Sequence, residues 1–249
     1  MEDSDFQYTN NDTTKESRKR TKRKSSTQTT NKFDNLSLID FKPLTTAQSM
    51  MVDSYNEGMN VIADGYAGVG KTYVATYLGL KDLFEGNIEK IIFVRSAVSI
   101  RSQGFLPGSQ AEKEAVYTTP FKSIVDSLLK NGTAWEVLSK KGYIEFMTTT
   151  YIRGISCDKS LIIIEEFQNM DASEIESVLT RVGKDSKVII CGDARQNDLN
   201  RKREQSCHEW LLTIARKMPD WFDVITFYPS DIVRSEFCKQ LIITIAETP

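Results

Sequence analysis

The chain has 249 residues, of which 40% are hydrophobic, and its 32 Lys/Arg and 34 Asp/Glu leave a net charge of −2. This length allows one or two domains with a sizeable core, and the charge excludes a protein that is basic throughout. No apolar run approaches the ~20 residues of a membrane span, and the amino terminus lacks the apolar core of a signal peptide. The chain is therefore predicted to be cytoplasmic, without a membrane partner. Its one histidine, His208, argues against a histidine-based triad or a multi-histidine metal site.

Residues 1–35 are polar and contain almost no aliphatic side chains. Such a segment buries too little apolar surface to offset its ordering entropy, so we predict a disordered tail before a folded domain at 36–249. Within it, residues 15–24 carry seven Lys/Arg against one acid, Glu16. This cluster is interpreted as an electrostatic arm for nucleic acid, a solvated tail or a targeting signal, and the sequence leaves the three open.

From residue 36 onward, helical and strand patterns alternate. The predicted helices cover 45–58, 71–84, 112–129 (interrupted near Pro120), 172–182, 208–218 and the segment from 230 onward. The predicted strands cover 59–63, 91–94, 143–147, 161–165, 187–191 and 223–227, and residues 99–109 are predicted to form a loop. Strands that alternate with helices indicate an α/β fold with a parallel sheet covered on both faces.

A phosphate-binding motif lies between the first strand and the second helix. Residues 65–72 match the pattern G-x-x-x-x-G-K-S/T in full, and they read Gly65-Tyr66-Ala67-Gly68-Val69-Gly70-Lys71-Thr72. In this motif the glycines let backbone N–H groups face phosphate oxygens, Lys71 supplies a cation to the β/γ-phosphates, and the Thr72 hydroxyl is a Mg²⁺ ligand. The following helix aims its positive dipole end at the same phosphates.

Two adjacent acids, Glu165 and Glu166, end the apolar strand 161–165. Side chains alternate in direction at a strand end, so two neighbouring acids are able to take two roles. Together with a phosphate loop, the first is predicted to hold Mg²⁺ and the second to polarise the attacking water. On its own, the same pattern would indicate only a solvated strand end.

Six ordered elements resemble those of the PhoH-like family of P-loop ATPases, which is related to superfamily 1 helicases. The family patterns are G-F-L-P-G, M-R-G, D-E-x-Q-N, T-R-I/V-G, G-D-x-x-Q and D-I/V-V-R. The matching segments are Gly104-Phe105-Leu106-Pro107-Gly108, Tyr151-Ile152-Arg153-Gly154, Glu165-Glu166-Phe167-Gln168-Asn169, Thr180-Arg181-Val182-Gly183, Gly192-Asp193-Ala194-Arg195-Gln196 and Asp231-Ile232-Val233-Arg234. The resemblance covers about residues 40–245.

The resemblance implies a single domain with a RecA-like core, the cofactors ATP and Mg²⁺, and a hexameric assembly. It places Gln48 at the adenine, Gln196 at the γ-phosphate, and Asp193 in support of Gln196. A stabilising arginine must come from another subunit or from elsewhere in the domain, and the candidates are Arg153, Arg181 and Arg234.

The sequence departs from the family pattern at two places. The first acid is Glu165 where the family has Asp, and Arg95-Ser96 stands where the family has R-P.

The function favoured by these features is Mg²⁺-dependent ATP hydrolysis by a helicase-related, oligomeric protein, with RNA or single-stranded DNA as candidate partners. Two rivals remain. One is a nucleotide-gated nucleic-acid-binding module with little or no hydrolysis, which Glu165 and the basic arm favour. The other is a small-molecule kinase, against which the Q-N and G-D-x-x-Q elements argue.

Overall fold

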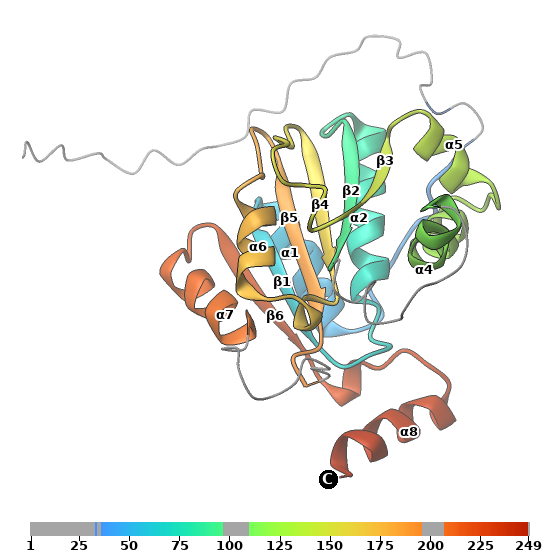
Figure 1. The fold of residues 1–249 in the computed structure, drawn as a ribbon. Coiled ribbons are helices and arrows are strands. Elements are labelled where there is room, and N and C mark those ends of the chain that lie inside the picture. Colours follow the sequence, from blue (N-terminus) through green and yellow to red (C-terminus); the bar gives the residue numbers. More distant parts are fainter. Residues whose placement is uncertain (1–32, 34–35, 97–109, 196–206, 249) are drawn as a thin grey trace, which may run out of the picture. The chain divides into compact units, whose positions relative to one another are not determined.

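A six-stranded sheet forms the centre of the fold in the computed structural model, which describes residues 33, 36–96, 110–195 and 207–248. The strands are β1 (Asn60–Gly65), β2 (Lys90–Arg95), β3 (Ile144–Thr148), β4 (Ser160–Glu165), β5 (Lys187–Gly192) and β6 (Phe222–Phe227). Their order across the sheet is β3-β2-β4-β5-β1-β6, and every neighbouring pair is parallel (Figure 1). All six residues of β4 are buried, as expected for a parallel strand covered on both faces. The predicted α/β class with a RecA-like core is confirmed.

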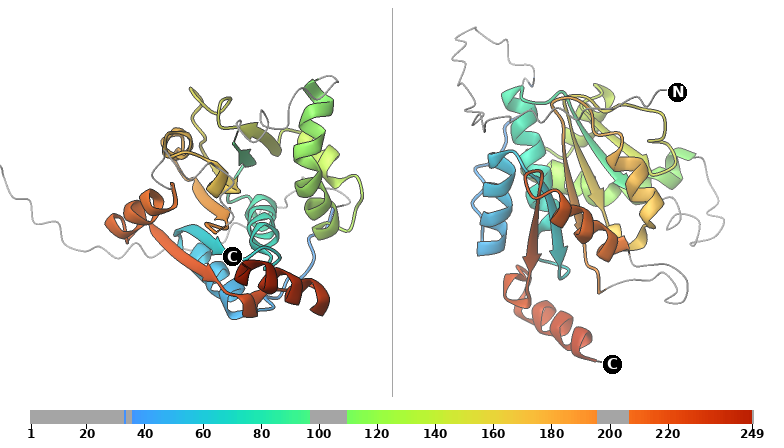
Figure 2. Two further views of the ribbon diagram at one scale, coloured as in Figure 1. Left: turned by 60° about the horizontal axis from the view of Figure 1, so that its bottom comes forward. Right: turned by 90° about the vertical axis from the view of Figure 1, so that its left-hand side faces the viewer.

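Helices cover both faces of this sheet (Figure 2). Those described are α1 (Thr46–Glu57), α2 (Lys71–Glu85), α4 (Gln110–Leu128), α5 (Ala134–Lys140), α6 (Ala172–Leu179), α7 (Cys207–Lys217) and α8 (Glu236–Glu247), with 3₁₀ turns η1 (Phe167–Asn169) and η2 (Pro229–Asp231). Helices α1, α2 and α4 pack on one face, whereas α6 and α7 pack on the other. In the part of the chain that the structure describes, no helix is long and apolar enough to cross a membrane.

Helix α4 differs from the prediction because it continues through Pro120 instead of being interrupted there. A proline inside a helix removes one backbone hydrogen bond and introduces a steric clash. Here Phe121, Val125 and Leu128 are fully buried on the next turns, and this packing holds the helix together.

Two helix boundaries also differ from the prediction, and one helix was not predicted. Helix α6 ends at Leu179 instead of Val182, because Val182 forms a parallel bridge with Cys157. The last helix begins at Glu236, where the Ser235 side chain caps it, so the residues after 230 first form a separate turn. Helix α5 was not predicted, and at seven residues it is too short to give a clear periodic pattern.

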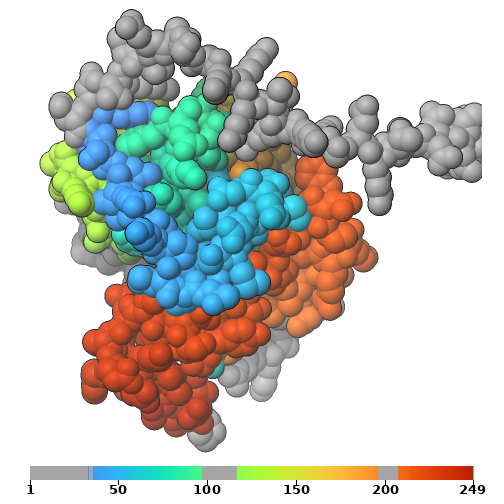
Figure 3. Space-filling view, turned by 180° about the vertical axis from the view of Figure 1, so that it is seen from behind, coloured from blue at the N-terminus to red at the C-terminus, as the bar shows by residue number. Residues whose placement is uncertain are grey.

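Helix α8 contributes nothing to the core, since none of its residues is buried. Its exposed apolar side chains include Phe237, Leu241 and Ile245. Figure 3 shows this carboxyl-terminal part of the chain, in red, on the same surface as α1, in blue. Almost all of the predicted tail 1–35, and the loop 99–109 with its G-F-L-P-G element, lie outside the described residues. The tail boundary therefore stays a prediction.

Candidate active site

The phosphate loop connects the end of β1 to the start of α2, as the motif predicts. Gly65, Gly68 and Gly70 all have positive φ angles, and Gly70 directly precedes the helix. At Gly65 an added Cβ would lie 2.1 Å from the carbonyl oxygen of Phe227, so the loop requires glycine at this point. The loop therefore curls back from the sheet and opens onto the amino-terminal end of α2.

The side chain of Lys71 folds back onto its own loop. Its Nζ donates to the carbonyl oxygens of Gly65 at 2.7 Å and Tyr66 at 2.8 Å. Burial lowers the pKa of Lys71, and the nearby Cys191 and Glu165 oppose this shift. The loop thus already holds the cation that the motif assigns to the β/γ-phosphates.

Glu165 and Thr72 meet across the site. Glu165 ends β4, which is separated from β1 by β5 alone, and the Thr72 hydroxyl donates a hydrogen bond to Glu165 Oε1. Burial raises the pKa of Glu165, while the hydrogen bond from Thr72 and the charge of Arg95 work in the opposite direction. A hydroxyl and a carboxylate in contact are a suitable oxygen donor pair for Mg²⁺, so these residues fit the metal that the motif implies.

Glu166 lies beside Glu165 but has a different environment. Its backbone is left-handed, with φ of 54°, and about half of its side chain is exposed. One carboxylate oxygen lies 3.2 Å from Arg95 Nη2, and the other accepts a longer contact of 3.4 Å from Asn169 Nδ2. The two adjacent acids therefore occupy different settings, one buried and one partly solvated, and their two roles stay predictions.

Sequence reasoning missed Arg95 as a site residue and mentioned it only as the residue before Ser96, where the family has proline. It ends β2, the strand next to β4, and its Nη2 also lies 3.7 Å from Glu165 Oε2. Its guanidinium lies over the Phe121 ring, 5.2 Å from the centroid. The sequence offered one signal, which was a charged residue at the end of a buried strand. A local sequence pattern does not show which strands are neighbours in the sheet.

Gln48 packs against the loop from α1. Its Nε2 donates to the carbonyl oxygen of Val69 at 2.9 Å, and its Oε1 accepts from the Leu44 backbone N–H at 2.8 Å. Both ends of the amide therefore contact the protein, and Gln48 ties the loop to the segment before α1. The predicted adenine contact by Gln48 stays a prediction.

The G-D-x-x-Q element begins at the end of β5, but its Gln196 lies outside the described residues. Asp193 is buried and accepts two hydrogen bonds from the Arg195 guanidinium, at 2.8 and 3.0 Å. The Asp193 backbone N–H donates to Gln168 Oε1 at 3.1 Å, which joins this turn to the D-E-x-Q-N element.

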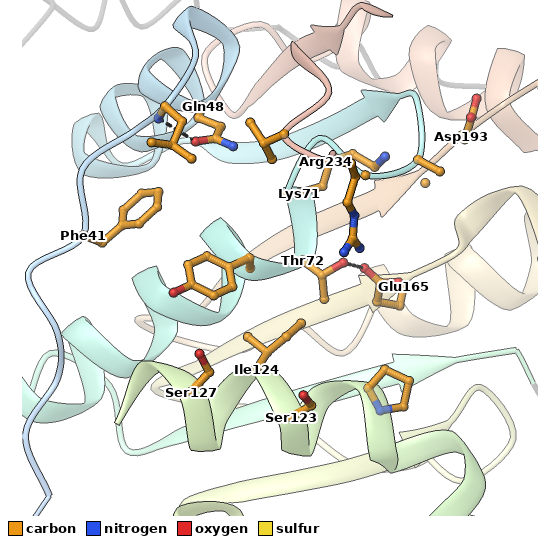
Figure 4. A pocket seen from close by; sticks show the side chains of 18 of the residues that line it. Phe41, Gln48, Lys71, Thr72, Ser123, Ile124, Ser127, Glu165, Asp193 and Arg234 are labelled. Atoms are coloured by element: carbon orange, nitrogen blue, oxygen red, sulfur yellow. Dashed lines mark hydrogen bonds between the residues drawn. The ribbon is translucent and has the colours of Figure 1, made fainter. Parts of the chain in front are cut away.

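Of the three candidate arginines, the structure brings only Arg234 to the phosphate loop. Its Cγ lies within 2.9 Å of the Cβ position at Gly68, and its side chain extends toward Thr72 and Glu165 (Figure 4). Arg153 is exposed in the turn between β3 and β4. The Arg181 carbonyl accepts a hydrogen bond from Cys157, which precedes β4, so Arg181 lies at the opposite edge of the sheet.

A cleft of about 820 Å³ joins these elements. Its walls are the segment 39–44, the phosphate loop, one face of α4, the two acids and Arg234 (Figure 4). Phe41 lies on this wall with its ring centroid 5.9 Å from that of Tyr73 and 4.9 Å from that of Tyr77. The volume is within the range of small-molecule and cofactor sites, and the aromatic wall offers an apolar surface beside the phosphate loop.

A phosphate loop after one strand of a parallel sheet, opposite a pair of acids two strands away, defines a nucleotide-binding domain of the P-loop ATPase class. Comparisons with known proteins identify the family within this class. The model of the family described as PhoH-like protein matches residues 40–246. The chain therefore belongs to the PhoH-like family, which confirms the resemblance found in the sequence.

Curated proteins that are similar in sequence to this chain carry the same family name. The chain is 34% identical over 186 residues to a PhoH-like protein of Bacillus subtilis, covering 73% of this chain and 56% of that protein. It is 33% identical over 175 residues to Protein PhoH2 of the same organism (67% and 39%) and 29% identical over 182 residues to Protein PhoH of Escherichia coli K12 (72% and 51%). The chain thus spans about half the length of the curated relatives it matches, or less.

Proposed function

We propose that this protein binds ATP and hydrolyses it to ADP and phosphate in a Mg²⁺-dependent reaction. The observation that carries the proposal is the contact between Thr72 and Glu165, with Glu166 beside it, at the mouth of a complete phosphate loop. This arrangement supplies a metal-binding oxygen pair, a cation for the phosphates and a separate carboxylate for water. These are the groups that phosphoryl transfer to water requires.

Each residue then has a defined task. Lys71, whose Nζ now binds two loop carbonyls, would donate to β/γ-phosphate oxygens, and Thr72 and Glu165 would hold Mg²⁺. Bound Mg²⁺ supplies charge neutralisation for the phosphate oxygens. Glu166 orients a water molecule whose oxygen bonds to the γ-phosphorus, while the bond to the bridging oxygen breaks and ADP keeps the electron pair. Glu166 takes up the proton released by the water.

The contributions of the remaining candidates are also proposals. Gln48 would read the adenine after releasing one of its present partners, and Gln196 would sense the γ-phosphate. Arg234 would act on its own nucleotide, and its position against Gly68 supports this proposal. Arg181 and Arg153 would act only from a neighbouring subunit, in a ring that we propose to be hexameric.

The decisive experiment measures turnover and binding in Glu166→Gln. A neutral amide polarises water poorly, so we expect ATP affinity to stay within about threefold while the hydrolysis rate falls by about 100-fold or more. Glu145→Gln is the matched control, because it changes a partly exposed glutamate on β3 outside the cleft. Equal turnover in wild type and Glu166→Gln would remove Glu166 from this role.

A second candidate function is ATP-gated nucleic-acid binding with little hydrolysis. The observation that favours it is the buried Glu165, whose longer side chain contacts Thr72 directly where the family has Asp. Turnover of labelled ATP by the wild-type protein, with and without RNA, separates the two functions. Measuring the mass of the assembly in the same samples tests the ring.

We also propose that the basic cluster at 15–24 binds RNA or single-stranded DNA through phosphates. Such contacts release counterions, so binding would be salt-sensitive and independent of sequence. Deleting residues 1–35 is expected to leave basal hydrolysis intact, to weaken binding at low salt and to flatten its salt dependence. Identical titration curves at three salt concentrations would leave the cluster a solvated tail.

A further inference from the structure

Arg95 is the one cation that contacts both acids in the described part of the site. Its Nη2 lies 3.2 Å from Glu166 Oε1 and 3.7 Å from Glu165 Oε2. A single guanidinium nitrogen thus lies between two carboxylates that are neighbours in the chain. None of the tasks assigned above uses this residue.

The Arg95 side chain is mostly buried in this position. It is 16% exposed, and the ring of the fully buried Phe121 supports its guanidinium. The Arg95 carbonyl accepts a hydrogen bond of 3.0 Å from the Thr149 N–H at the end of β3. Both its backbone and its side chain are therefore fixed by neighbouring elements.

The buried carboxylate of Glu174 connects the ends of β2 and β3 to helix α6. Glu174, in the first turn of α6, accepts hydrogen bonds from the Ser96 hydroxyl at 3.0 Å and from the Thr149 hydroxyl. Helix α6 follows the turn that begins at Glu166. Glu174 thus fixes the strand end that carries Arg95 relative to the segment that carries Glu166.

Glu166 needs such a partner, because its side chain is 47% exposed and it follows the end of β4 in a left-handed backbone conformation. An exposed glutamate loses rotamer freedom when it is held in one orientation. Its repulsion from the charge of Glu165 also favours orientations toward solvent. Arg95 opposes both effects, since it attracts Glu166 toward Glu165 and holds one of its oxygens.

We propose that Arg95 is the positioning residue that holds Glu166 at the attacking water and acts on the hydrolytic step without contributing to nucleotide binding. This inference rests on the proposed ATPase function. It predicts that Arg95 acts through Glu166, so its effect must depend on the presence of that carboxylate.

The test is a double-mutant cycle on the full-length protein with Mg–ATP as substrate. Arg95→Met is expected to lower kcat about 10- to 100-fold with KM for ATP unchanged within twofold, because water orientation is lost and binding is kept. In single-turnover measurements, adding Arg95→Met to Glu166→Gln is expected to change the rate by less than about twofold. Arg95→Lys keeps the charge without the planar fork and is expected to give an intermediate kcat.

Lys90→Met is the matched control, because it removes a cation and an ion pair from the opposite end of the same strand. Additive effects of Arg95→Met and Glu166→Gln, an unchanged or raised kcat in Arg95→Met, or a loss confined to KM would each overturn the assignment. If Arg95→Met does not fold, as judged by thermal melting, wild-type kcat in Arg95→Lys overturns it, and a reduced kcat with unchanged KM supports it. Absence of turnover in the wild type would overturn the proposed function together with this inference, whereas wild-type turnover with an unaffected Arg95→Met overturns the inference alone.

Discussion

The two ends of the parallel strands differ in how much their charged side chains are exposed. At the carboxyl ends of the strands, the charged side chains of Glu165 and Asp193 are buried. Glu166, next to Glu165, has a left-handed backbone conformation. At the amino ends, charges meet in partly exposed pairs such as Lys90–Glu145 at 2.6 Å and Lys159–Glu89 at 2.7 Å. Burying a charge costs free energy, and exposed pairs contribute little. The costly buried charges of this fold therefore lie at the proposed ligand site, and the nearly neutral exposed pairs lie at the other end of the strands.

The largest expected effect is that of Lys71→Ala on ATP binding. This change removes the loop's cation, so we expect affinity for Mg–ATP to fall by about 100-fold or more and turnover to be lost. Stability is expected to change little, because the residue's desolvation cost disappears with its two hydrogen bonds. Calorimetric titration and thermal melting measure the two properties, and wild-type affinity would show that the loop is not a phosphate site.

Changes at Glu165 should separate stability from function. Burial raises the pKa of Glu165 above its ordinary value of 4.5, so protonation of this side chain stabilises the fold. This stabilisation is fully present below pH 4.5 and is lost as the pH rises through the pKa of the folded state. Glu165→Gln should therefore melt higher than wild type without ligand at neutral pH and less so in acid, while losing Mg²⁺-dependent turnover. A lower melting temperature at neutral pH would mean that the ionised carboxylate stabilises the fold.

Glu165→Asp restores the family's shorter side chain and withdraws the carboxylate from direct contact with Thr72. We expect turnover to be kept or raised, measured under the same conditions as for the wild type. If this substitution unfolds the protein, Glu165 serves the fold and not the metal.

A matched pair of glycines compares the two edges directly. A Cβ at Gly192 would lie 2.4 Å from Phe167 and 2.5 Å from Gln168, beside the acids, whereas one at Gly183 would lie 1.9 Å from Asp158 at the amino edge. Overpacking costs about 1–3 kcal/mol, so both alanine variants should lose stability. At temperatures below the unfolding transition, Gly192→Ala should also lower kcat, while Gly183→Ala should keep the kcat of the wild type. Equal kcat losses would show that the site is sensitive to strain anywhere in the sheet.

The smallest effect is expected for Lys90→Met. Its partner Glu145 is one-third exposed, so the pair contributes about 0–1 kcal/mol. Chemical denaturation should show a change within this range, with kcat for ATP unchanged. A larger loss would mean that the amino edge also depends on specific electrostatic contacts.

The sequence predicted those parts of the site that a continuous motif contains. The loop at 65–72 was predictable because each of its residues acts through local geometry next to a strand and a helix. The position of Arg95 beside both acids was not predictable, because it depends on β2 lying next to β4, and sheet order follows from the packing of the whole domain. The unbroken α4 was missed for a related reason, since the burial of Phe121 outweighs the local effect of Pro120.

The two hydrogen bonds from Lys71 to the loop have a consequence for selectivity. Two of the three N–H groups of the ammonium already bind loop carbonyls, so a phosphate that takes more than the remaining N–H has to displace a carbonyl acceptor. A small anion that satisfies only the lysine gains little from this exchange, whereas a triphosphate that also engages the loop amides and the helix end gains at several points at once. We therefore expect the loop to favour a triphosphate over free phosphate or sulfate.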